Sequence, residues 1–160
     1  MANVIQSEFL LDDGSVQTMP DFWNVSRDVH PGMRAVSPDV MLVQALLMGH
    51  FMSPAGPRPD LKNRAATITS SSGKRFDDGI YGPNTRLVMA LFEEDMRAPV
   101  KDGIVRAASV HNVLKGPETK LKKLNTSWNL MMLGELGGTK KETGRGALQP
   151  VLFRELYPSG

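Results

Sequence analysis

The sequence predicts a mainly α-helical fold, in which a small bundle of helices follows a β-hairpin and precedes a C-terminal extension. Apolar residues recur at helical spacing in segments that open with proline and close near glycine. An Asp-Gly turn lies between two short segments near the N-terminus, as in a hairpin. Of the 160 residues, 41% are hydrophobic and 22% charged, so the chain has the composition of a folded domain.

The N-terminal region, residues 1–35, is predicted to hold the hairpin and a segment that leads into the helices. The ribbon spans Gln6 to Met19, and Asp13-Gly14 supplies the positive φ that a tight turn needs. Because an isolated hairpin is marginally stable in water, we expect it to pack on the rest of the chain.

The first helix is predicted to begin after Ser37 and to end at Gly49. Ser37 suits the N-cap, Pro38 the first helical position and Asp39 the positive end of the helix dipole. The helix is apolar over a broad face, which predicts a central position in the core. Gln44 is the polar exception, and a buried amide there would need hydrogen-bond partners.

Residues 53–76 are interpreted as an insertion. They contain three prolines and three consecutive serines, and 65–69 is the part with the character of a strand. A connection of this length is uncommon inside a compact domain.

A second helix is predicted from Pro83 to a point before Pro99. Its apolar residues share one face, and the acidic group Glu93, Glu94 and Asp95 is expected to be exposed.

Three further segments are predicted toward the C-terminus. A third helix is expected over about 105–115, and a possible fourth over 118–133. The closing apolar group, 151–157, is expected to dock on a neighbouring surface, either of this molecule or of a partner.

The most informative pattern is a pair of Asp-Gly turns. Asp78-Gly79 precedes the second helix, and Asp102-Gly103 repeats the turn and a following apolar residue 24 positions later. The repetition suggests two similar loop-helix units.

These turns, together with the upstream stretch Val43-Gln44-Ala45-Leu46-Leu47, resemble the peptidoglycan-binding domain family. The three elements occur in the family's order and span Val36 to about Leu114. The resemblance implies a small orthogonal three-helix bundle over 36–124, followed by a C-terminal extension over 125–160. The chain departs from the family pattern at Glu93, where the family often has Gln, at Arg106-Ala107, and in the long insertion.

The function that the resemblance implies is non-catalytic binding of peptidoglycan, which would anchor a partner or particle to the bacterial wall. The candidate ligand-binding residues are Asp78, Tyr81, Asn84 and Arg86, and the last three are expected at the exposed rim of the loop. Asp78 also has a sufficient structural explanation as a turn residue.

The alternative function is a structural adaptor in a phage tail or contractile injection machine, which would use the same fold to contact other subunits. It is motivated by apolar residues outside the recognised region, namely Phe9, Leu10, Trp23, Trp128, Phe153 and Tyr157.

Other classes of function find no signature. The chain has no cysteine, and His30, His50 and His111 form no metal-ligand pattern, so neither a metal nor another cofactor is expected, and no set of catalytic residues can be nominated. A net charge of +2 does not imply nucleic acid, and no apolar run predicts a membrane span. The N-terminal residues lack the features of a signal peptide, so we expect synthesis in the cytoplasm, with access to the wall through lysis, a phage particle or an injection machine.

Overall fold

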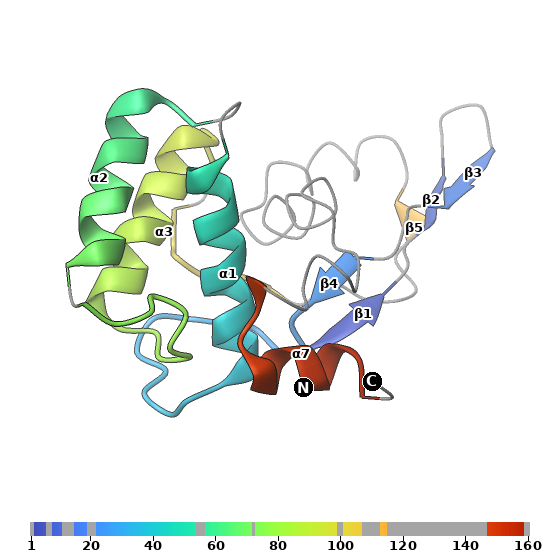
Figure 1. Ribbon diagram of the computed structural model, residues 1–160. Coiled ribbons are helices and arrows are strands. Elements are labelled where there is room, and N and C mark those ends of the chain that lie inside the picture. The colour runs from blue at the N-terminus through green and yellow to red at the C-terminus, as the bar shows by residue number, and fades with distance from the viewer. Residues whose placement is uncertain are drawn as a thin grey trace.

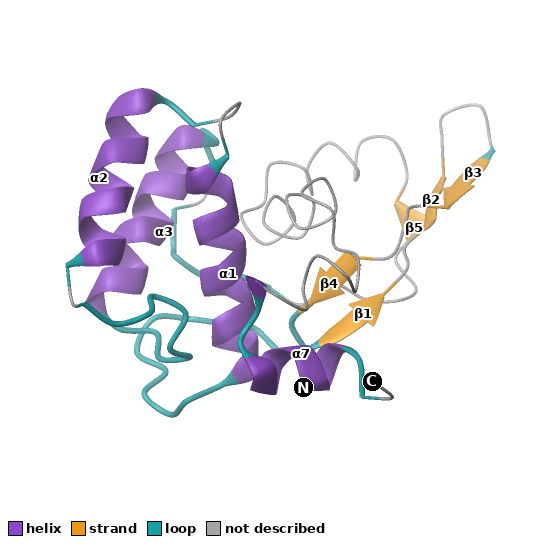
Figure 2. Cartoon of the chain, viewed as in Figure 1, coloured by secondary structure: helices purple, strands orange, loops and turns teal. Residues whose placement is uncertain are grey.

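The computed structural model describes residues 2–5, 8–10, 15–18, 22–53, 57–71, 73–98, 101–106, 113–114 and 147–158. This part of the chain is mainly helical. Three helices lie side by side at one end of the molecule, the short strands lie at the other, and the C-terminal helix lies below them (Figures 1 and 2).

Helix α1, Pro38–Met52, is the central helix of the core, as predicted. It begins directly after Ser37 but continues past Gly49. Its buried residues are not confined to one side, because it packs against α2, α3, α7 and strand β4. Ser37 occupies the N-cap position, yet its side chain makes no capping hydrogen bond. Its backbone N–H instead donates to the carbonyl of Gly79 at 3.0 Å.

Helix α2, Pro59–Ser70, overturns the expectation of a strand at 65–69. Leu61 and Ala65 are buried and Ile68 packs against the core, which is the spacing of one helical stripe. Pro59 stands at the first turn, where proline starts a helix and costs no hydrogen bond. The segment interpreted as an insertion therefore contributes a helix to the bundle.

Helix α3, Pro83–Asp95, begins at the predicted residue and packs against α1 and α2. Its apolar face is buried as expected. The expected exposure of the acidic group is wrong for Glu93, which is fully buried, and for the side chain of Asp95, which is 6% exposed, whereas Glu94 is exposed.

The helix predicted over 105–115 is not observed at either end. Val105 forms an isolated antiparallel bridge with Val29, with both N···O distances 2.8 Å, and Val113–Leu114 form strand β5. The backbone hydrogen bonds at these positions are made with extended segments elsewhere in the chain, so they are not available to a helix. Residues 107–112 and the possible helix at 118–133 lie outside the described residues.

The short strands form two small sheets. Strands β2, Glu8–Leu10, and β3, Val16–Thr18, pair antiparallel with Phe9 opposite Gln17, which confirms the predicted hairpin. Its turn, 11–14, lies outside the described residues. Strand β5 pairs with β2 in parallel, and β1, Asn3–Ile5, pairs antiparallel with β4, Phe22–Asn24.

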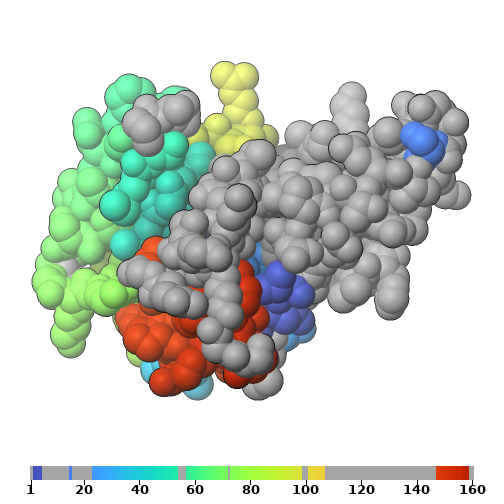
Figure 3. Space-filling view, turned by 45° about the vertical axis from the view of Figure 1, so that its right-hand side comes forward, coloured from blue at the N-terminus to red at the C-terminus, as the bar shows by residue number. Residues whose placement is uncertain are grey.

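Helix α7, Pro150–Leu156, docks on this molecule. Its Leu152 and Leu156 are buried, and it packs against α1 and β1, so that the described segments nearest the two ends of the chain lie side by side (Figure 3). The Trp23 indole N–H donates to the Tyr157 hydroxyl at 3.0 Å. The core of this chain thus includes or contacts the side chains of Trp23, Phe153 and Tyr157. Trp128 and the side chains of Phe9 and Leu10 lie outside what the structure describes.

Candidate functional site

The first Asp-Gly turn has the predicted conformation. Gly79 has φ +84°, the left-handed region that favours glycine, and the Ile80 N–H donates to Asp78 Oδ1 at 2.9 Å. A Cβ atom at Gly79 would lie 3.0 Å from side-chain atoms of Val36 and Met41 on the neighbouring segment. Both the backbone conformation and the close packing therefore require glycine.

Gln44 holds this turn from the middle of α1. Its side chain is fully buried, and its Oε1 accepts the Gly79 N–H at 2.9 Å. Its Nε2 lies 3.1 Å from Asp78 Oδ1, 3.1 Å from the Ile80 carbonyl and 3.0 Å from Thr85 Oγ1. The amide that needed partners finds them in the motif loop, and so it ties α1 to the start of α3.

The second turn repeats this geometry with a different buried side chain. Gly103 has φ +72°, and the Ile104 N–H donates to Asp102 Oδ1 at 3.0 Å. The Gly103 N–H donates to Glu93 Oε2 at 3.1 Å, and the other carboxylate oxygen pairs with Arg86 at 3.0 Å. Each turn therefore presents its glycine N–H to a buried side-chain oxygen on a helix.

Tyr81 joins the two turns. Its hydroxyl donates to the Gly103 carbonyl at 2.6 Å, and its backbone N–H donates to the Met33 carbonyl at 3.1 Å. Only 2% of the residue is exposed, so the expectation that Tyr81 lies at the rim is wrong. Burial raises the pKa of the Tyr81 hydroxyl above its ordinary value, and nearby Glu93 and Asp102 add to the increase against the opposing effect of Arg86.

The four predicted ligand-binding residues separate into two pairs. Asp78 and Asn84 are exposed and line one pocket, whereas Tyr81 and Arg86 are turned toward the second Asp-Gly turn. Arg86 is partly exposed, but its guanidinium is paired with Glu93. The sequence offered a signal for this pair, because residues 86 and 93 stand two helical turns apart on one side of α3.

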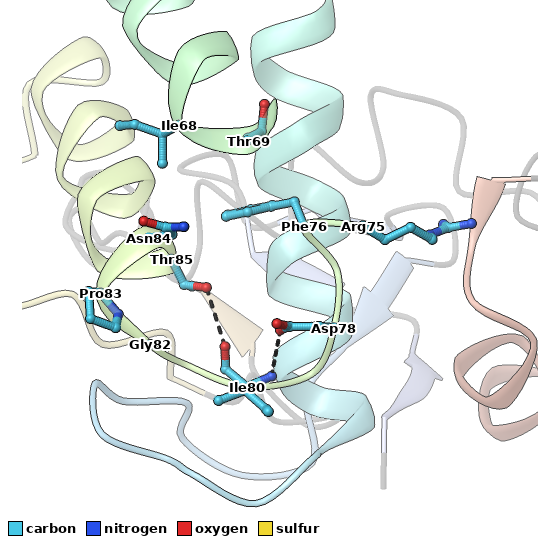
Figure 4. A pocket seen from close by; sticks show the side chains of 10 residues that line it. All are labelled: Ile68, Thr69, Arg75, Phe76, Asp78, Ile80, Gly82, Pro83, Asn84 and Thr85. Atoms are coloured by element: carbon cyan, nitrogen blue, oxygen red, sulfur yellow. Dashed lines mark hydrogen bonds between the residues drawn. The ribbon is translucent and has the colours of Figure 1, made fainter. Parts of the chain in front are cut away.

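The pocket lies between the end of α2, the loop 75–80 and the start of α3 (Figure 4). It is partly open to solvent and has a volume of about 320 Å³. Its apolar walls come from Ile68, Phe76, Ile80 and Pro83, and its polar lining includes Thr69, Asp78, Asn84 and Thr85. The insertion proposed from the sequence thus forms one wall of the pocket, through Ile68 and Thr69 of α2.

The described residues show no group of three or more His, Asp or Glu side chains that could hold a metal ion. Of the histidines, His50 pairs with Asp95 at 2.8 Å and both side chains are buried, so this pair joins the ends of α1 and α3. Within the same described ranges, no helix is long and apolar enough to cross a membrane.

Comparison with known proteins gives no match: no protein-family model, no curated protein and no solved structure is similar to this chain at a significant level.

Proposed function

We propose that this chain is a non-catalytic module that binds peptidoglycan at the pocket beside the Asp78-Gly79 turn. The observation that carries the proposal is the position of this pocket. It opens at the motif loop on which the resemblance rests, and two of the four candidate residues, Asp78 and Asn84, line it.

The chemistry of the lining supports a ligand made of sugars and short peptides. Ligand sites commonly combine apolar walls with a few polar groups that fix orientation. Ile80 and Pro83 offer apolar surface to the C–H face of a sugar ring, and the Asn84 amide can both donate to and accept from an acetamido group. None of these contacts requires a reaction, so the proposed role is attachment.

Retention on purified sacculi tests the proposal. Thr69 lies on the pocket wall, and Thr67 lies two residues earlier on the exposed side of the same helix. We expect Thr69→Trp to fill the pocket and abolish co-sedimentation, and the matched variant Thr67→Trp to sediment like the wild type. Equal sedimentation of the two variants, or no sedimentation of the wild type, would contradict a wall-binding role for the pocket.

The adaptor role is the alternative proposal, and the engagement of Trp23, Phe153 and Tyr157 within the chain removes part of its motivation. Light scattering on the purified chain separates the two functions. An oligomer that forms without wall material would favour the adaptor, and a monomer that binds sacculi would favour the wall-binding module.

A further inference from the structure

The charge of the pocket comes from one carboxylate. Asp78 and Arg75 are the two ionisable residues that line it. The Arg75 side chain extends away from the pocket toward the C-terminal segment (Figure 4), where its guanidinium pairs with both oxygens of Asp77 at 2.9 Å and reaches the Ala147 carbonyl at 3.3 Å. The Arg75 charge is therefore balanced by the buried carboxylate of Asp77. The Asp78 carboxylate then determines the sign of the electrostatic potential in the pocket.

One oxygen of Asp78 is available to a ligand. Its Oδ1 accepts hydrogen bonds from the Ile80 N–H and from Gln44, which fixes the carboxylate in place. Its Oδ2 accepts no hydrogen bond from the part of the chain that the structure describes. The turn thus orients a carboxylate whose second oxygen is an acceptor that the described residues do not use.

The start of α3 opposes a positively charged ligand only in part. A helix N-terminus carries the equivalent of about half a positive charge, and a carboxylate carries a full negative one. Arg86, a cation on α3 outside the pocket lining, is paired with Glu93. The balance at the pocket wall is therefore negative.

The other walls fit an alkyl chain. Ile68, Phe76, Ile80 and Pro83 bring aliphatic and aromatic carbon to the pocket, and its volume of about 320 Å³ exceeds that of one extended amino-acid side chain. A ligand with a methylene chain and a terminal ammonium would place the chain on these walls and the ammonium at Asp78, as a charge-assisted hydrogen bond requires.

We infer that the pocket recognises a primary ammonium on an alkyl chain, with Asp78 as the residue that determines this specificity. This inference rests on the proposed wall-binding function. In peptidoglycan the group of this chemistry is the free side-chain amine of the diamino acid in stem peptides that are not cross-linked. The module would then select wall material according to how many of its stem peptides remain uncross-linked.

The test compares native sacculi with sacculi whose free amines have been acetylated. We expect the full wild-type chain to bind the acetylated sacculi about fivefold more weakly, the order of one charge-assisted hydrogen bond that is partly exposed to solvent. Asp78→Asn keeps an Oδ1 acceptor for Gln44 and the Ile80 N–H and removes the charge. This variant should bind native sacculi as weakly as the wild type binds acetylated ones, and it should not distinguish the two.

Asp60→Asn is the matched control, because Asp60 is an exposed carboxylate on α2 outside the pocket lining. It should keep the wild-type preference, and thermal unfolding of all three proteins shows whether each is folded. Equal wild-type binding to native and acetylated sacculi would overturn the amine specificity and leave wall binding intact. A preference for native sacculi that persists in Asp78→Asn would overturn the role of Asp78. No binding to either preparation would overturn the proposed function itself.

Discussion

The two Asp-Gly turns share a backbone conformation but differ in the side chain that holds them and in what lies beside them. A neutral amide, Gln44, holds the first turn, whereas the Glu93 carboxylate holds the second and is paired with Arg86. The first turn opens beside a pocket. The second is covered by Tyr81 and Arg86, whose side chains lie 2.9–3.0 Å from where a Cβ atom of Gly103 would stand. Similar local sequences thus border a pocket in one place and form a buried contact between two turns in the other.

The largest expected effect comes from Glu93, the charged side chain that holds the second turn. Glu93→Ala leaves the Gly103 N–H without its acceptor and Arg86 without its partner. We expect a loss of about 3 kcal/mol in the free energy of unfolding, the lower end for a broken buried pair, since Arg86 is partly exposed. Denaturant unfolding measures this loss, with Glu94→Ala on the exposed side as the control.

Glu93→Gln sharpens the comparison, because it gives the second turn the amide chemistry of the first. It keeps an acceptor for Gly103, so it should cost less than Glu93→Ala in the same experiment. Equal losses would mean that the charge of Glu93, and not its hydrogen bond, holds the turn.

Gln44, the neutral side chain that holds the first turn, should give the next largest effect. Gln44→Ala leaves the buried Gly79 N–H unsatisfied and a cavity inside the core, at an expected cost of about 2–3 kcal/mol in the free energy of unfolding. Because Gln44 also fixes Asp78, sacculus binding should fall in the fraction that remains folded. Retained binding in this variant would mean that the hydrogen bonds made by Gln44 are not needed for ligand binding at the pocket.

Substitution of the first-turn glycine tests the backbone itself. Gly79→Ala should cost about 1–2 kcal/mol in unfolding free energy, since the left-handed region is unfavourable for residues with a Cβ atom. Gly49→Ala, in the interior of α1 with open space where the added Cβ atom would stand, is the control and should be neutral or stabilising. Equal effects on stability would contradict the need for a positive φ at residue 79.

Loss of the hydrogen bond by which Tyr81 joins the two turns should have a smaller effect. Tyr81→Phe removes the hydrogen bond to the Gly103 carbonyl and should cost about 1 kcal/mol at pH 7. The pKa of Tyr81 is raised in the folded state, so the unfolded chain loses this proton first and wild-type stability falls as the pH rises above the ordinary value of about 10. The phenylalanine variant should lose less stability over that alkaline range, which denaturant unfolding at several pH values can measure.

The smallest effect is expected at the edge of the second turn. Burial alone would raise the pKa of Asp102, but the hydrogen bond from Arg106, the Ile104 N–H and the Arg106 charge together lower it. A lowered pKa contributes stability above the unfolded value, and this contribution is lost as the pH falls. Asp102→Ala should therefore cost less than about 1 kcal/mol at pH 7, because solvent screens this partly exposed pair, and the difference from wild type should shrink in acid.

Local signals in the sequence were sufficient for several parts of the fold. Pro38 and Pro83 start their helices as predicted, and both Asp-Gly pairs adopt the left-handed glycine conformation. The N-terminal strands pair as a hairpin. These features depend on residues close together in the chain, whose backbone preferences and turn chemistry can be read directly.

The main error concerns 53–76, whose prolines and serines obscured a helix. The buried face of α2 consists of Leu61 and Ala65 with Ile68 beside them, a stripe too narrow to stand out from the polar residues around it. Helix propensity is a weak prior, and contacts with α1 and α3 stabilise this segment in ways that its own residues do not reveal.

The sequence by itself determined where the turns and two of the helices begin, because proline, glycine and Asp-Gly pairs act on the backbone next to them. Only the tertiary structure decided which candidate residues face solvent. Tyr81 and Glu93 are buried because the second turn folds back onto α3, and Asp78 and Asn84 line one pocket because the end of α2 lies beside the loop and the start of α3. Burial and proximity depend on segments distant in the chain, so no local pattern contains them.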